Sequence, residues 1–344
     1  MKKTILAIGV LMALCTHSFA QDKSSNNNFK KGFYLKAAGG YFMSVSSGQF
    51  PNVGPYPPEE VYQTYDPSTA TYTNVSTKVL TGSYGAGIQA GLSGGYAFNK
   101  FISAELTLNY FHSKSNLMTH QVTTISSGPL MGQQAGNIIS NGHVNALALS
   151  PSIVITPGFE SKFNPYIRFG VVVPVWGRLY ILTDAYKLST NMTGYPATYV
   201  GQTTIHREEE IRPNITVGFV SALGGTYKIS KCLDIFAEIE YRNVPVESKN
   251  KEVTTYNEVT NIVNLANGST VGTATRGLND LSTAERNTNY QTTLTQNSNT
   301  PTGITDPTHP TQTQYKNNNA PSDDLKSYIN IGGLGLNVGV KFRL

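Results

Sequence analysis

The chain has 344 residues, of which 14% are charged, and its formal net charge is +5 at pH 7. Water-soluble domains usually carry about 25% charged residues, so the composition disfavours an ordinary soluble fold. The positive charge is small and scattered, which argues against nucleic acid as a partner. Glycine (32 residues) and tyrosine (20 residues) are frequent, as expected of a β-sheet with one face in lipid.

The N-terminus has the features of a secretory signal peptide. Lys2 and Lys3 precede an apolar run over 5–14, and Ser18 and Ala20 are the small residues that a signal peptidase requires. We therefore expect export, with cleavage after Ala20. The apolar run is shorter than the about 20 residues that a helix needs to cross a bilayer.

Eight segments have the composition or alternation of β-strands. They cover residues 32–43, 84–98, 101–111, 143–156, 164–182, 211–227, 233–243 and 327–344. In the third segment, Leu106 and Leu108 fall on one face and Glu105 on the other. This period of two predicts strands with one apolar and one polar face.

The connections between these segments alternate between short and long. Asn99-Lys100, a loop at Pro157-Gly158 and residues 228–232 make the short ones. The long ones are 44–83, 112–142, 183–210 and 244–326. Outer-membrane barrels have short periplasmic turns and longer extracellular loops, so the pattern favours such a barrel.

The predicted fold is therefore all-β, an eight-stranded antiparallel up-and-down transmembrane β-barrel over 32–344. A signal peptide at 1–20 and a periplasmic N-terminal segment at 21–31 precede it. Two loop segments, 71–80 and 252–265, can extend hairpins above the membrane or join the ring. Ten strands is accordingly the alternative count.

The last eight residues carry a family resemblance. Their pattern is a polar residue, Gly, an aromatic and an apolar C-terminal residue at Asn337, Gly339, Phe342 and Leu344. It resembles the β-signal of small outer-membrane barrels of the OmpA/OmpX kind, especially the outer-membrane β-barrel (porin-family) proteins of Bacteroidetes. Leu344 departs from the Phe or Trp that this family prefers.

The resemblance covers the strands and none of the loops. It implies insertion into the cell outer membrane by the barrel-assembly machinery, in contact with outer-membrane lipid and lipopolysaccharide. It implies a fold and a location, but it says little about function, since one fold hosts many activities.

Four charged residues fall at the same depth on alternate strands, on the inferred lumen face: Lys36, Glu105, Arg168 and Glu238. Their signs alternate around the barrel. The interior of eight strands is only wide enough for side chains, and buried charges are costly unless they are paired. We therefore expect a salt-bridge layer that closes the lower lumen; the alternative is a wet, loosely paired interior. The candidates for extending the layer are Glu240, Arg242, Lys341 and Arg343.

Signals for catalysis or metal binding are weak. His112, His120 and His143 fall in or beside neighbouring strands, but no carboxylates accompany them, and parity puts His112 on the lipid-facing side. The acidic triplet 208–210 is interpreted as a solvated rim. We expect no catalytic residue, no cofactor and no metal.

The long loops suggest the function. They are rich in Tyr, Ser, Thr and Asn, which suits contact with surface proteins or glycans. We expect a non-enzymatic barrel of the Gram-negative cell surface that anchors these loops for interaction or envelope integrity. The alternatives are a narrow porin-like channel for small solutes and an outer-membrane hydrolase.

Overall fold

The computed structural model describes residues 31–45, 48–158, 161–190, 194–305 and 312–344. The predicted signal peptide and residues 21–30 of the N-terminal segment lie outside these residues. Within the described part of the chain, no helix is long and apolar enough to cross a membrane.

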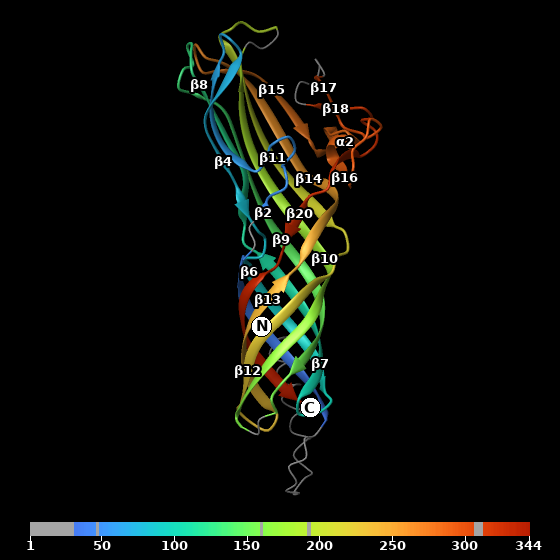
Figure 1. Ribbon diagram of the computed structural model, residues 1–344. Coiled ribbons are helices and arrows are strands. Elements are labelled where there is room, and N and C mark those ends of the chain that lie inside the picture. The colour runs from blue at the N-terminus through green and yellow to red at the C-terminus, as the bar shows by residue number, and fades with distance from the viewer. Residues whose placement is uncertain (1–30, 46–47, 159–160, 191–193, 306–311) are drawn as a thin grey trace, which may run out of the picture.

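Eight antiparallel strands close into a barrel, which Figure 1 shows from the side, so the predicted all-β fold with an eight-stranded antiparallel barrel is confirmed. Each ring strand pairs with the next one along the chain, and the last pairs with the first, with Lys36 opposite Lys341. The ring strands are β1 (Gly32–Met43), β6 (Gly87–Ala97), β7 (Ile102–Ser113), β9 (Gln134–Ile155), β10 (Phe163–Ser189), β12 (Gly218–Lys228), β13 (Leu233–Asn243) and β21 (Gly333–Arg343).

The ring strands alternate between lumen and outside, as their sequences predict. In β13, Glu238 and Glu240 are buried in the lumen, whereas Ile235 and Ile239 are exposed on the outer wall. The barrel thus has a polar interior and an apolar exterior at this level.

Short turns join ring strands at one end only. In the turn between β6 and β7, the Asn99 side chain accepts hydrogen bonds of 2.8 Å from the backbone amides of Phe101 and Ile102. Gly158, in the turn between β9 and β10, has a φ of +70°, a conformation that favours glycine. Leu344 ends the chain at this same end, where its amide donates to the Phe33 carbonyl at 2.9 Å.

Further strands lie outside the ring, most of them in the predicted long loops. They are β2 (Gly48–Gln49), β3 (Glu59–Asp66), β4 (Thr71–Val79), β5 (Thr81–Gly82), β8 (Asn116–Ile125), β11 (Tyr199–Pro213), β14 (Pro245–Asn264), β15 (Thr270–Gly277), β16 (Asn287–Gln291), β17 (Pro301–Thr305), β18 (Thr313–Tyr315), β19 (Ser322–Leu325) and β20 (Tyr328–Asn330). Two short helices, η2 (Leu278–Asp280) and α2 (Thr283–Arg286), lie between β15 and β16.

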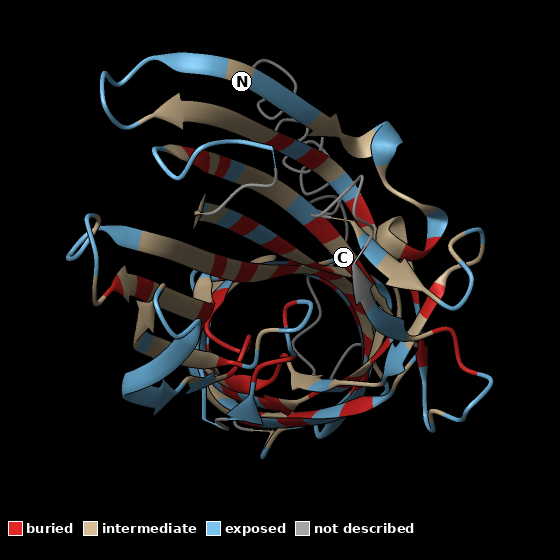
Figure 2. Cartoon of the chain, turned by 90° about the horizontal axis from the view of Figure 1, so that it is seen from above, coloured by how far each residue is buried: buried red, intermediate tan, exposed pale blue. Residues whose placement is uncertain are grey.

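A tall sheet rises from one side of the ring, in the order β4–β3–β8–β9–β10–β11–β14–β15. We call it the upper sheet. Figure 2, which looks down on the ring, shows it curving along one side. The segments at 71–80 and 252–265 are in this sheet, as β4 and part of β14, so the ring keeps eight strands and the alternative of ten is wrong.

Several predicted strand boundaries are wrong. β9 begins nine residues before the predicted 143, β10 continues seven residues past 182, and the predicted strand 211–227 divides into β11 and β12. Likewise, 327–344 divides into β20 and β21. The added stretches 134–142 and 183–189 pair largely with one another and are mainly polar, so they lack the apolar alternation by which a half-buried strand is recognised.

Candidate functional site

The four charged residues predicted to share a lumen layer do lie together. The Lys36 Nζ is 3.2 Å from Glu105 Oε1 and 4.0 Å from Glu238 Oε2. The Arg168 Nη2 is 2.6 Å from Glu238 Oε1, and its Nε is 4.0 Å from Glu105 Oε1. Each cation therefore touches both anions, and all four side chains are buried.

Two lumen tyrosines complete the hydrogen bonding of these carboxylates. The Tyr34 hydroxyl donates to Glu105 Oε2 at 3.2 Å, and the Tyr166 hydroxyl donates to Glu238 Oε2 at 2.6 Å. Buried charges are tolerated when such bonds fill their remaining lone pairs. Gly95 leaves room for the first of these rings, because a Cβ there would lie 2.1 Å from the Tyr34 ring.

The four residues predicted to extend the layer lie in different surroundings. Glu240 joins it, with its Oε2 at 2.8 Å from Arg168 Nη2. Arg343 instead forms an ion pair with Asp234 nearer the turn end, and the Lys341 Nζ lies 3.9 Å from the centroid of the Tyr34 ring.

Arg242 lies between two aromatic rings. Its guanidinium carbon is 4.1 Å from the Phe42 centroid and 4.2 Å from the Phe111 centroid. Stacking of this kind stabilises a desolvated guanidinium. Its Nη1 donates to Gln89 Oε1 at 2.7 Å, whereas its Nε and Nη2 have no hydrogen-bond partner.

Two amides that the sequence analysis did not place in the layer connect it. The Gln89 Nε2 donates to Asn337 Oδ1 at 3.2 Å, and the Asn337 Nδ2 donates to Glu240 Oε2 at 2.9 Å. Both alternate with outward-facing residues along their strands, and this alternation could have placed them in the lumen from the sequence. We call Lys36, Glu105, Arg168, Glu238, Glu240, Arg242, Gln89 and Asn337 the lumen network; its three cations and three anions balance.

The four residues of the predicted β-signal take separate positions at the end of β21. Asn337 is in the lumen network. Gly339 lies so close to β1 that a Cβ would be 2.1 Å from the Ala37 carbonyl oxygen. Phe342 pairs with Leu35 and Leu233, and Leu344 is exposed at the turn end.

An apolar layer lies directly above the lumen network. Phe42 and Phe111 form its floor, and Tyr84, Phe50 and Met118 pack over them. Buried chain segments cross the mouth of the ring in Figure 2. These side chains are buried, so an apolar layer covers the charged one inside the ring.

The outer wall carries an apolar band between two rings of aromatic side chains. The lower ring contains Phe33, Phe98, Phe101, Phe163 and Tyr227, and the upper ring contains Tyr41, Tyr110, Trp176, Phe219 and Tyr241. Exposed aliphatic side chains such as Leu106, Leu223 and Leu336 fill the band. Between the rings, the outward positions of the described ring strands carry no charged side chain.

The three histidines do not form one site. The rings of His112 and His143 lie 5.4 Å apart on the outer wall, where His143 stacks on Tyr180. His120 is on β8, with its Nδ1 at 3.3 Å from Glu60 Oε1. Among the described residues, no group of three or more His, Cys, Asp or Glu side chains is placed to hold a metal ion.

The interpretation of 208–210 as a solvated rim is wrong for Glu209. Its side chain is 1% exposed on the inner face of the upper sheet, 2.7 Å from Arg207 Nη2 and 2.9 Å from Lys251 Nζ. Burial alone would raise its pKa, but the two cations outweigh burial and lower the pKa to about 2. Strand alternation explains the difference, because Glu208 and Glu210 face outward.

The structure thus defines a class: a closed eight-stranded antiparallel barrel, filled inside and apolar outside, that continues upward as a sheet. No protein-family model matches the sequence, and no curated protein matches it either.

Proposed function

We propose that this chain is a non-enzymatic outer-membrane barrel that anchors the upper sheet at the cell surface, where the sheet contacts other molecules. The observation that carries the proposal is the apolar outer band between two aromatic rings. Such a band costs free energy in water, at about 25 cal/mol per Å² of apolar surface, and is the surface that a bilayer stabilises.

The height of the band fits a bilayer. Phe33 and Tyr41 mark its two edges on β1. Eight residue steps at about 3.3 Å, on a strand tilted by roughly 40°, span roughly 20 Å between ring centres. Transmembrane barrels present an apolar band of about 25 Å, so the dimension supports a membrane-spanning barrel.

The filled lumen favours a role as an anchor rather than as a channel. A solute would have to separate the Arg168–Glu238 and Lys36–Glu105 ion pairs and displace the Phe42–Phe111 floor above them. Separating buried ion pairs costs several kcal/mol. The porin-like channel is therefore the competing outcome of the test.

The test combines location with conductance. Purified protein should migrate faster on gels before heating than after it, because a closed barrel resists detergent. Protease added to intact cells should cut upper-sheet loops such as 266–269 and leave the ring strands whole. In planar bilayers the protein should give no steady conductance steps; reproducible steps would establish the channel instead.

A further inference from the structure

The barrel wall has a gap where the ring meets the upper sheet. The β10–β12 pairing ends at Val172 opposite Gly218, and the β10–β11 pairing begins at Leu179 opposite Ile211. Between them, residues 173–178 of β10 and residues 212–217, which end β11 and lead into β12, are not paired with each other. Pro174 and Pro213, which have no N–H to donate, stand on opposite sides of this gap.

The chain on the far side of the gap is held away from β10. The Asn214 amide donates to the Glu247 carbonyl at 2.8 Å, and the Thr216 hydroxyl donates to the Pro245 carbonyl at 2.8 Å. The segment 214–217 therefore bonds toward β14. The gap therefore results from the strand pairing, in which this segment bonds to β14 and not to β10.

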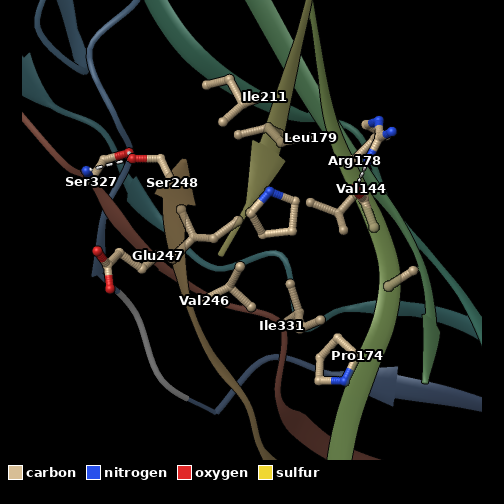
Figure 3. A pocket seen from close by; sticks show the side chains of 14 residues that line it. Val144, Pro174, Arg178, Leu179, Ile211, Val246, Glu247, Ser248, Ser327 and Ile331 are labelled. Atoms are coloured by element: carbon tan, nitrogen blue, oxygen red, sulfur yellow. Dashed lines mark hydrogen bonds between the residues drawn. The ribbon is translucent and has the colours of Figure 1, made fainter. Parts of the chain in front are cut away.

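A narrow apolar cleft leads inward from this gap (Figure 3). Its cavity volume is about 30 Å³, so the cleft is narrow. The side chains whose apolar ends converge on it are Val144, Leu179, Ile211, Val246 and Ile331. These five belong to the apolar layer that closes the lumen.

The polar groups of the cleft lie at its edges. In Figure 3 the Arg178 guanidinium and the Glu247 carboxylate point away from the apolar side chains. Arg178 is bound to Glu210 at 3.5 Å, and Glu247 forms an ion pair with Lys326. The cleft therefore offers a ligand apolar contact inside and charged groups outside.

The rim of the gap is exposed and apolar. Ile215 is 89% exposed, Val217 59%, Val175 52% and Trp176 40%. Trp176 belongs to the upper aromatic ring, so the gap opens at the upper edge of the apolar band. If the band lies in a bilayer, as proposed above, this rim is at the interface of the outward-facing leaflet.

We propose that the cleft binds the end of one alkyl chain of a membrane lipid, which enters sideways through the gap between β10 and the 212–217 segment. The inference rests on the proposed membrane location. The narrow cross-section suits a single unbranched chain and excludes fused rings. Transfer of each methylene from water to the apolar lining is favourable by about 0.8 kcal/mol. The rim is continuous with the lipid-facing band, so a membrane lipid is the ligand that can reach the cleft.

Photo-crosslinking tests this site. The protein is reconstituted in phosphatidylcholine vesicles that contain a phospholipid with a diazirine at the end of one acyl chain. After irradiation, modified peptides are mapped by mass spectrometry. We expect adducts at the inward-facing Val144, Leu179 and Ile331, in addition to adducts at the lipid-facing Leu106 and Leu223.

Gly177→Leu is the blocking variant. A Cβ at Gly177 meets only ordinary contacts, with Ala146 Cβ at 3.8 Å and Pro213 Cγ at 3.8 Å, so a leucine there fills the cleft. We expect the inward adducts to fall by roughly tenfold or more, since losing two buried methylenes weakens binding by about that factor. Gly94→Leu is the matched control, because its Cβ meets nothing within 4 Å.

The outcomes separate this inference from the proposed function. Adducts at Leu106 and Leu223 without inward adducts would overturn the alkyl-chain site and leave the membrane barrel standing. A lack of both would overturn the membrane proposal as well. Inward adducts that persist at full yield in a heat-modifiable Gly177→Leu protein, and in an independently filled Ala146→Leu protein, would overturn the site too.

Discussion

The lower and upper halves of β10 place similar sequences in opposite surroundings. In the lower half, the odd-numbered Ile167 and Phe169 point outward, and the even-numbered Arg168 points into the lumen. In the upper half, the odd-numbered Leu179 and Ile181 are again apolar, but they point inward.

A bulge between Pro174 and Trp176 causes this reversal, because one extra residue shifts every later side chain to the other face. Outward positions above it hold Arg178, Tyr180 and Asp184, of which Asp184 is exposed. On the proposed membrane location, the medium outside the strand changes from apolar to aqueous at the bulge, the level of the upper aromatic ring. The four predictions below test that interpretation.

Deleting Val175 should have the largest effect. Without the extra residue, Leu179 and Ile181 would turn outward and Asp184 would turn inward, so the upper sheet would lose its apolar packing. We expect the upper sheet to become sensitive to trypsin while the ring keeps its heat-modifiable mobility. A deletion variant with an intact, protease-resistant upper sheet would contradict the role assigned to the bulge.

Two arginines on β10 should differ strongly in their contribution to stability. Arg168→Met leaves Glu238 and Glu240 buried without their cation, and this should lower the free energy of unfolding by about 3–5 kcal/mol. Arg178→Met removes a partly exposed pair with Glu210 and should cost less than about 1 kcal/mol. Urea unfolding in lipid vesicles measures both, and equal losses would show that the lumen network is wet.

Arginine substitutions at two outward-facing leucines, one below the bulge and one above it, should show where the surroundings change from lipid to water. Leu223→Arg puts a charge in the middle of the apolar band and should cost about 2–4 kcal/mol in a bilayer. Leu182→Arg, on the outward face above the bulge, should cost about 0–1 kcal/mol. The same unfolding assay measures the difference. Similar costs at both positions would show that the band does not lie in lipid.

The sequence predicts the ring well because its signal is local. Alternation in segments such as 233–243 gives the strand and both of its faces, and β13 has these bounds in the structure. The common depth of Lys36, Glu105, Arg168 and Glu238 follows from the same alternation once the ring is assumed. Eight strands then bring the four side chains within reach of one another.

The rest could not be predicted because it depends on pairing between distant segments. β11 pairs with β14 as well as with β10, and the inward position of Glu209 follows from these pairings and from the burial of Ile211 beside it. Nothing in the triplet 208–210 distinguishes its middle residue. The bulge at Pro174 and Trp176 is equally hidden, because the apolar parity of the sequence continues through it unchanged.

Glu209 should make the upper sheet sensitive to acid, the smallest of the four effects. Because Arg207 and Lys251 hold its folded-state pKa at about 2, below the ordinary value of 4.5, the ionised form stabilises the sheet above pH 4.5. That stabilisation, about 3 kcal/mol, is lost as the pH falls from 4.5 toward 2. Hydrogen exchange of β11 and β14 peptides, corrected for the intrinsic rate, should accelerate over this range.

Glu209→Gln tests the cause of this acid sensitivity. It should exchange faster already at pH 6 and change less on acidification, because its neutral side chain cannot compensate Arg207 and Lys251 at any pH. Glu208→Gln is the matched control, since that neighbour is half exposed on the opposite face. If both variants behaved alike, burial would not be what separates the two carboxylates, and the inner face of the upper sheet would be as open to water as its outer face.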